Sequence, residues 1–296
     1  MGELTIQWYP GHMTKTRRQM EEDLKLVDAV CELVDARIPM SSRNPEIDTL
    51  CGRKPRLIIL NRVDMADSQT VKLWAAYFRA KGYAVILTDC KSRRGIQTFV
   101  PAVRELLAEK LRRYAEKGQL GRPLKLMIVG IPNVGKSTFI NQIAGRKGAK
   151  AENRPGVTRG KQWVTVDQGL LLLDTPGILW PKFEDRQVGL KLAYTGAVKD
   201  AVYDVEELAA NLIELLWRSY PDALRERYGI TAEPDAAGWQ LLELAAARRG
   251  FLLAKGELNT ERMARVLLEE YRSTKLGRFC LEQPPEEGEP HDGADT

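Results

Sequence analysis

The sequence predicts an α/β domain with a mostly parallel sheet, followed by a small all-α domain. Between residue 29 and about residue 130, short apolar runs alternate with helical patterns, and this alternation is typical of parallel strands joined by helices. Beyond residue 205 the pattern indicates helices only. The chain has 296 residues, 44% of them hydrophobic, which is enough to bury one medium core and a smaller one.

The apolar runs define the expected strands of the first domain. Four runs predict strands that are joined by helices around 67–80 and 95–114, and these runs lie at 29–34, 56–60, 84–87 and 124–129. Two further runs, 162–166 and 170–173, predict a hairpin because only Asp167-Gln168-Gly169 separates them.

The helical part of the chain begins after a predicted domain boundary between about 180 and 204. Asp204 is the expected N-cap of the first helix, and the four helices are predicted at 205–219, 221–228, 236–248 and 260–272. The predicted division of the chain is a basic N-terminal arm at 1–20, the α/β domain at 21–190, the helical domain at 204–280 and an acidic disordered tail at 281–296.

The net charge of +5 hides an uneven distribution. The segment 281–296 carries six acidic residues and no Lys or Arg, so the rest of the chain holds 45 basic residues against 34 acidic ones. A basic body favours a polyanionic partner such as nucleic acid. A basic solvated surface with no such partner is equally compatible with charge alone.

Several classes of protein are disfavoured by composition. No run of eighteen apolar residues is present, so we expect no membrane span, and the N-terminus lacks the apolar stretch of a secretory leader. The four cysteines are scattered without a Cys-x-x-Cys pair, which argues against a zinc site and against a disulfide framework. We therefore expect a cytoplasmic protein.

A phosphate-binding loop is predicted at 130–137, which reads Gly-Ile-Pro-Asn-Val-Gly-Lys-Ser and fits G-x-x-x-x-G-K-S. It follows an apolar strand and precedes a helical stretch, so its backbone amides and the helix N-terminus can surround a phosphate. Lys136 is expected to reach the β- and γ-phosphates, and Ser137 to hold magnesium. The residues predicted to bind GTP here are Asn133, Val134, Gly135, Lys136, Ser137 and Thr138.

Two further segments are typical of a site that senses the γ-phosphate. Asp174-Thr175-Pro176-Gly177 ends an apolar run about forty residues after the phosphate loop. Asp174 is expected to orient magnesium through water, and the Gly177 amide to reach the γ-phosphate. Thr158 fits a switch threonine that closes on magnesium.

Asn61-Arg62-Val63-Asp64 reads as a guanine-recognition tetrad after the second strand. The Asp64 carboxylate would accept hydrogen bonds from the guanine N1–H and exocyclic amine, which adenine cannot offer. Arg62 stands where a Lys is usual, and its planar guanidinium can still lie over the base. Asp89-Cys90-Lys91 follows the third strand, where backbone amides would read the guanine O6.

The tetrad precedes the phosphate loop, which reverses the order of an ordinary GTPase. Since all the parts are present, the sequence predicts a circularly permuted P-loop GTPase domain that binds GTP or GDP with magnesium. An ATPase or small-molecule kinase is disfavoured by Asn61 and Asp64.

Together these residues resemble the circularly permuted bacterial GTPases of the YlqF/RbgA family. The resemblance extends from residue 8 to residue 278 and includes Trp8-Tyr9-Pro10-Gly11-His12-Met13, the tetrad, the phosphate loop, Pro155-Gly156-Val157-Thr158 and Lys275-Leu276-Gly277-Arg278. It implies a role in late assembly of the large ribosomal subunit, with the helical domain contacting rRNA. The basic residues that could contact its phosphates are Arg248, Arg249, Arg262, Arg265, Arg272, Lys275 and Arg278, with Trp239 or Phe251 nearby for packing or stacking. For any one of these side chains the alternative reading is a solvated basic helix face or a core aromatic.

The residue that orients the attacking water is not evident. Ile178 occupies the position where Ras-like enzymes carry a Gln. The resemblance implicates His12 in hydrolysis, whereas an anchoring or RNA-contacting role is the alternative reading of His12. In similar GTPases an Asn at the position of Asn133 helps to bind potassium. The alternative reading is that the Asn133 side chain stabilises its own loop. An RNA-binding scaffold that holds GTP with little hydrolysis therefore remains a second hypothesis.

Overall fold

The structure, a computed structural model, describes residues 11–145, 163–167, 169–175, 185–198 and 203–285, and the side chains from residue 17 onward within the first range. The described residues form a six-stranded sheet in the order β3-β2-β1-β4-β6-β5. Five strands are parallel: β1 (Ala29–Asp35), β2 (Arg56–Asn61), β3 (Ala84–Thr88), β4 (Leu124–Val129) and β6 (Leu170–Asp174). The edge strand β5 (Trp163–Asp167) pairs with β6 in the antiparallel direction.

The strands and the hairpin predicted from the apolar runs are confirmed. Most end one residue later than expected, because a polar residue completes the pairing: Asp35 pairs with Asn61 across β1 and β2, and Asn61 pairs with Thr88 across β2 and β3. Every residue of β1 and β2 is buried, as is typical of parallel strands covered on both faces.

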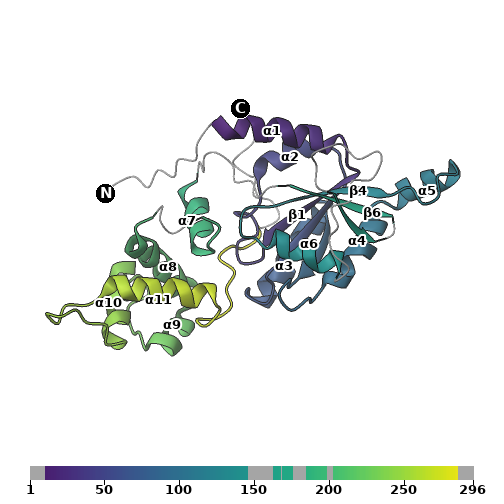
Figure 1. Cartoon of the computed structure of the whole chain (residues 1–296). Helices are drawn as coiled ribbons and strands as arrows, with labels where there is room; N and C mark the ends of the chain where they lie inside the picture. Colours follow the sequence, from purple (N-terminus) through teal and green to yellow (C-terminus); the bar gives the residue numbers. More distant parts are fainter. Residues whose placement is uncertain (1–10, 146–162, 168, 176–184, 199–202, 286–296) are drawn as a thin grey trace.

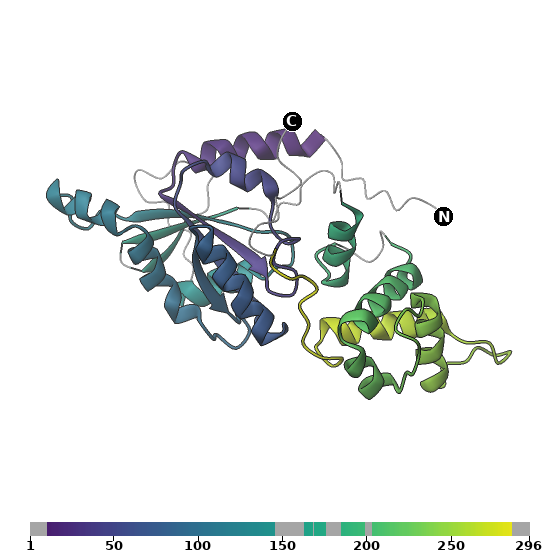
Figure 2. The same cartoon turned by 180° about the vertical axis from the view of Figure 1, so that it is seen from behind.

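Helices cover both faces of the sheet (Figures 1 and 2). The helices α1 (Gly11–Leu24), α2 (Pro45–Cys51) and α3 (Ser68–Ala80) pack on one face, and α4 (Phe99–Leu106) and α6 (Lys136–Ala144) pack on the other. The single helix expected around 95–114 is divided into the short 3-10 helix η1 (Ile96–Thr98), α4 and α5 (Ala108–Glu116). The backbone of Leu107, at φ −108° and ψ 20°, separates the last two.

Helix α1 crosses the boundary that the sequence placed at residue 20. Met20 and Leu24 are buried against Val30, Met127 and Leu173 on one face of the sheet. The second half of the predicted arm is therefore helical, and its last residue belongs to the core of the α/β domain.

The helical domain consists of α8 (Val205–Ser219), α9 (Pro221–Tyr228), α10 (Gly238–Arg248) and α11 (Thr260–Arg272). Three of these helices have the predicted bounds, and α10 begins two residues later. The predicted cap is confirmed, because the Asp204 carboxylate accepts from the amides of Glu206 and Glu207 at 2.9 and 3.0 Å. Within the described ranges, no helix is long and apolar enough to cross a bilayer.

Helix α7 (Arg186–Tyr194) lies between the two domains and was not predicted (Figures 1 and 2). Leu192 packs into the core of the α/β domain, whereas Leu190, Ala193 and Tyr194 pack into the core of the helical domain. Because its apolar residues serve two cores, α7 does not belong to either predicted domain alone, and it spans the predicted boundary at residue 190.

The chain returns from α11 to the α/β domain through residues Phe279–Glu282, which we call the C-terminal strap (Figure 1). The Phe279 amide donates to the Met65 carbonyl at 3.3 Å, and the Leu281 amide donates to the Arg37 carbonyl at 2.8 Å. Glu282 is 8% exposed and accepts from the Met40 amide at 2.7 Å.

These contacts correct the start of the acidic tail, which the sequence placed at residue 281. The Glu282 carboxylate also accepts from the Ser41 amide at 3.2 Å and from Lys191 Nζ at 3.2 Å. Composition does not reveal such contacts because the donors lie more than 90 residues away in sequence.

Candidate guanine nucleotide site

The polar segments singled out in the sequence lie together at the carboxyl edge of the parallel sheet. Asn61 is the last residue of β2, the phosphate loop follows β4, Asp174 is the last residue of β6, and Asp89 follows β3. The carboxyl edge of an open parallel sheet is where ligands bind in such folds.

The phosphate loop has the backbone geometry of an anion cradle. Asn133 and Gly135 have φ values of 59° and 103°, so the chain curls before α6 begins at Lys136. A Cβ on Gly130 would lie 2.8 Å from the Leu33 carbonyl oxygen, so only glycine allows this approach. Ser137 and Thr138, in the first turn of α6, are exposed. The helix N-terminus therefore faces open space with its amides available to a phosphate.

Asn61 joins the base-reading segment to the phosphate loop. Its side chain is buried, and its Nδ2 donates to the Val134 carbonyl at 2.9 Å. Its Oδ1 accepts from the Cys90 amide and from Thr88 Oγ1, both at 3.2 Å. One side chain thus fixes three loops relative to one another, which places the predicted nucleotide-binding segments in a single site.

Arg62 also contacts the phosphate loop. It has a left-handed backbone, at φ 63°, and its Nη2 donates to the Asn133 carbonyl. Its Nη1 lies 3.5 Å from Asp35 Oδ2. The guanidinium is therefore held by polar contacts on two sides, where the sequence suggested only stacking on a base.

Two carboxylates lie on the side of the site where a base would be read. Burial, reinforced by the nearby Asp89 charge, raises the pKa of Asp64 above its ordinary value. The Asp89 carboxylate accepts from the amides of Lys91 and Ser92 at 2.8 and 3.2 Å. The amides of Cys90 and Lys91, which the sequence assigned to the guanine O6, are thus hydrogen-bonded within the protein.

Lys136 and Asp174 face each other beside the phosphate loop. Lys136 Nζ donates to the Thr175 carbonyl, and Thr175 Oγ1 donates to the Ile128 carbonyl at 2.6 Å. Burial lowers the pKa of Lys136 and raises the pKa of Asp174, and their mutual attraction only partly offsets both shifts.

The residues at this position fit a magnesium ion. Asp174 Oδ1 is buried and has no hydrogen-bond partner among the described residues. Ser137 offers an exposed hydroxyl on the adjacent helix. Magnesium prefers oxygen ligands and commonly binds through a carboxylate, water and substrate phosphates.

Some predicted site residues lie outside the described residues. These are Thr158, Gly177 and also Ile178, which replaces the usual Gln. The backbone of His12 lies in the first turn of α1, but its side chain is not among those described. The structure therefore does not test their roles.

A buried pair at the end of β1 was not predicted from the sequence. Arg37 is 1% exposed, and its Nε and Nη2 donate to the two carboxylate oxygens of Asp35 at 3.0 and 2.8 Å. The same carboxylate faces Arg62. The sequence signal that could have predicted this pair is its position at the end of a buried strand. That position lies at the same edge of the sheet as the tetrad.

The phosphate loop, the magnesium-side carboxylate on β6 and the guanine tetrad after β2 define a P-loop GTPase. Its tetrad precedes its phosphate loop in sequence, so the GTPase domain is circularly permuted. A family model described as 50S ribosome-binding GTPase matches residues 125–224.

The chain is a GTPase and belongs to the YlqF family of ribosome biogenesis GTPases. Its bacterial relatives in this family are named ribosome biogenesis GTPase A. Ribosome biogenesis GTPase A of Priestia megaterium is 46% identical over 97% of this chain and 100% of that protein. The same protein of Bacillus cereus is 45% identical, over 97% and 96% of the two chains. Mitochondrial ribosome-associated GTPase 1 of Mus musculus is 34% identical, over 95% and 91%.

Solved structures agree with this assignment. GNP-bound YlqF from T. maritima is 28% identical and covers 91% of this chain and 98% of its own, with a TM-score of 0.62. A GDP-bound YlqF structure is also 28% identical, covering 90% and 99%, with a TM-score of 0.61.

Proposed function

We propose that this GTPase is an assembly factor that binds the large ribosomal subunit, or its precursor, during late biogenesis. The matched family model is described as 50S ribosome-binding, and the relatives are named for ribosome biogenesis or ribosome association. The observation that carries the nucleotide part is the Asn61 side chain, which ties the guanine tetrad to the phosphate loop. The proposed partner implies a cytoplasmic location.

The protein's own groups suggest how GTP is held. The first-turn amides of α6 and the ammonium of Lys136 would bind the phosphates, while Asp64 would accept from the guanine N1–H and amine. Lys136 is held by the Thr175 carbonyl in the described structure, so it would exchange that partner for a phosphate oxygen. Ser137 and, through water, Asp174 would hold Mg²⁺, whose charge would offset the charge on the phosphates.

Base recognition is tested by changing the carboxylate that reads guanine. In Asp64→Asn the amide nitrogen would face the guanine amine with a second donor, so we expect GDP affinity to fall at least about 100-fold. The same amide would donate to the 2-oxo group of xanthine, so affinity for xanthosine diphosphate should rise. Equal loss for both nucleotides would argue against this role of Asp64.

Binding to the large subunit is tested by GTP turnover with and without purified large subunits. Under the proposed function, turnover is slow alone and rises with added subunits. Binding to the subunits without increased turnover would instead favour the alternative hypothesis, an RNA-binding scaffold that holds GTP. No binding would remove the proposed partner.

We propose that His12 supplies a function that Ile178 lacks in hydrolysis. Its backbone lies at the start of α1, and the family resemblance supports this role. His12→Ala is then expected to retain GTP affinity and to lose ribosome-stimulated turnover. Stimulated turnover at the level of the unaltered chain would assign His12 to anchoring or RNA contact.

We propose a potassium ion as a further cofactor, bound through the side chain of Asn133. The Asn133 Nδ2 donates to the Gly196 carbonyl at 2.9 Å, so the group offered to a cation is the amide oxygen. A cation there would offset growing negative charge on the phosphates. Turnover in potassium should exceed turnover in sodium, and Asn133→Ala should remove the difference.

The helical domain would contact rRNA through a subset of its basic residues. Arg249 pairs with Glu270 at 3.0 Å, and the exposed Arg265 pairs with Glu261 at 2.7 Å. Arg248 and Lys275 are also exposed and have no ion pair among the described residues. Replacing Arg248 and Lys275 by Gln should weaken binding to large subunits and reduce the salt slope by about one for each phosphate that is no longer neutralised. An unchanged slope would place the RNA-binding residues elsewhere.

A further inference from the structure

The C-terminal end of α7 is held by donors from both domains. The last carbonyls of a helix have no partner within it, so they are open to donors from outside. From the helical domain, Arg272 Nε donates to the Tyr194 carbonyl at 3.0 Å, and Arg272 Nη2 donates to the Ala193 carbonyl at 2.7 Å. A single guanidinium on α11 thereby holds two successive carbonyls of α7.

The next two carbonyls are held from the GTPase domain. Arg37 Nη2 donates to the Thr195 carbonyl at 3.4 Å, and Asn133 Nδ2 donates to the Gly196 carbonyl at 2.9 Å. Asn133 belongs to the phosphate loop, and Arg37 is paired with Asp35, which also faces Arg62 of the tetrad. Both hydrogen bonds therefore lead directly to the nucleotide site.

The turn between these two sets of hydrogen bonds is tightly defined. Gly196 has a left-handed backbone, at φ 76°, and its amide donates to the Ala193 carbonyl at 3.0 Å. The Ala197 amide donates to the Leu192 carbonyl at 2.9 Å, which completes a Schellman motif. Because these bonds fix the four carbonyls relative to one another, a shift at one end moves the other.

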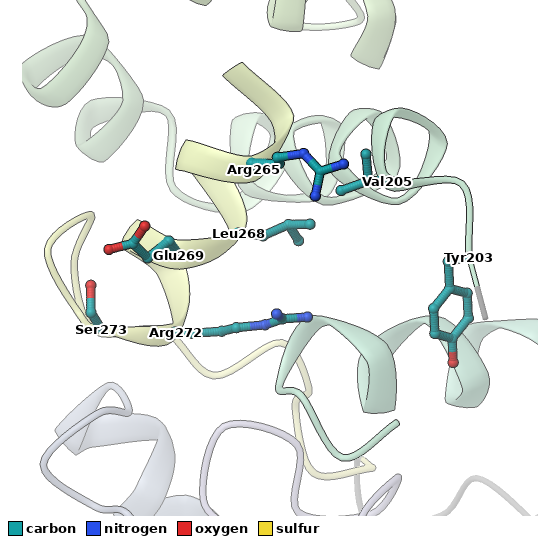
Figure 3. Close-up of a pocket in the computed structure, with 7 residues that line it drawn as sticks. All are labelled: Tyr203, Val205, Arg265, Leu268, Glu269, Arg272 and Ser273. Carbon is teal, nitrogen blue, oxygen red and sulfur yellow. The ribbon is translucent and has the colours of Figure 1, made fainter. Parts of the chain in front are cut away.

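Arg272 lines a pocket of about 780 Å³ between α11 and the segment that leads into α8 (Figure 3). Arg265 extends from the same helix into the same pocket, one heptad earlier. It pairs with Glu261 on its own helix at 2.7 Å. The two arginines thus share a helix and a pocket, but they differ in that Arg272 donates to the carbonyls of α7.

We propose that Arg272 is a positioning residue for the phosphate loop, acting through the C-terminal turn of α7 on Asn133. This inference rests on nucleotide binding at the phosphate loop and adds a route by which that site and the helical domain influence each other. Energetic coupling between two sites is reciprocal. The hydrogen bonds from Arg272 to the carbonyls of α7 should therefore slow nucleotide release. In turn, bound nucleotide should stabilise the α7 turn.

A double-mutant cycle on GDP dissociation tests the route. Arg272→Ala is expected to speed release of a fluorescent GDP derivative by about 5- to 10-fold, within the usual range of coupling between sites. In an Asn133→Ala background the same change should have a much smaller effect, because only the longer of the two hydrogen bonds to the turn, from Arg37 at 3.4 Å, then remains. Arg265→Ala removes the same charge from the same helix and should leave release unchanged.

Each alternative outcome would overturn the inference. Equal acceleration by Arg272→Ala in both backgrounds would mean that Asn133 does not carry the effect. Equal acceleration by Arg265→Ala would assign the effect to charge alone, and no acceleration would show that the turn is not coupled. Absence of GDP binding to the unaltered chain would instead remove the nucleotide site itself.

A measurement on the unaltered chain covers the case in which Arg272→Ala does not fold. Saturating GDP should slow amide hydrogen exchange at Gly196 and Ala197 by about 5- to 10-fold, the factor expected for GDP release. The end of α10 provides a matched reference, since the amides of Gly250 and Phe251 donate to Ala247 and Ala246 in the same motif, at 3.0 and 2.9 Å. Equal change at both turns, or no change at the α7 turn, would overturn the inference.

Discussion

The side-chain nitrogen of Asn61 donates to the backbone carbonyl of Val134 at 2.9 Å, across 73 residues of sequence. This bond joins the end of β2 to the phosphate loop after β4, two elements separated in the sheet by β1. The reversed order of motifs therefore leaves the spatial arrangement of the site intact.

Replacing Asn61 tests this bond. In Asn61→Ala, the Val134 carbonyl and the Cys90 amide are both left without this partner. We expect the free energy of unfolding to fall by about 2–4 kcal/mol, since unsatisfied buried groups cost about 1–3 kcal/mol each. GDP affinity should fall as well, because the phosphate loop is no longer fixed by this bond. Urea unfolding and nucleotide titration measure the two effects, and a stability change without an affinity change would restrict Asn61 to a structural role.

Two glycines at opposite ends of α6 offer a matched comparison. A Cβ on Gly135, at φ 103°, would lie 2.5 Å from Asn61 Nδ2, whereas a Cβ on Gly145, at φ 68°, would meet nothing within 4 Å. Gly145→Ala should cost about 1 kcal/mol from backbone strain alone. Gly135→Ala should cost at least about 2–3 kcal/mol and abolish measurable GDP binding. Similar losses in both variants would contradict the crowding at Gly135.

Asp174 predicts a distinctive pH dependence in the nucleotide-free protein. Burial raises the pKa of its carboxyl above the ordinary 3.8, so the folded state keeps the proton to a higher pH than the unfolded state does. Its contribution to stability is therefore present below pH 3.8 and declines as the pH rises through the folded-state pKa. Relative to Asp174→Asn, the unaltered chain should lose stability as the pH rises from 3.8 to the folded-state pKa of Asp174.

The same substitution tests the magnesium assignment by a separate measurement. Asp174→Asn should weaken magnesium-dependent GTP binding by about 10- to 100-fold, the usual effect of removing a group that orients metal-bound water. Binding measured with magnesium removed should change much less. Unchanged magnesium dependence would assign the buried carboxylate a role other than the metal.

Truncation tests how much the residues after Cys280 contribute to stability. A chain that ends at Pro285 should match the full chain in stability to within about 0.5 kcal/mol, because the strap is intact. A chain that ends at Cys280 lacks the Leu281 bond to Arg37 and the Glu282 bonds to Met40 and Lys191. It should be less stable by about 2–4 kcal/mol in urea unfolding. Equal stability of the two chains would show that the contacts of Leu281 and Glu282 contribute nothing.

The sequence by itself determined the domain classes, the strands and the nucleotide-binding motifs. Local patterns suffice for these, because strands buried on both faces are continuously apolar and a phosphate loop requires glycines at fixed spacing. The cap at Asp204 was predictable for the same reason, since its hydrogen bonds reach only two or three residues along the chain.

Only the tertiary structure decided how the two domains meet. Helix α7 serves two cores, so its apolar residues show no single face to one domain. The strap residue Glu282 lies in an acidic stretch, yet it is buried because its amide and ammonium partners come from distant segments. Arg272 and Asn133 meet the same helical turn from opposite domains. Such relationships depend on which backbone carbonyls and amides have no local partner once the chain has folded. The spacing of residues in the sequence does not show which groups these are.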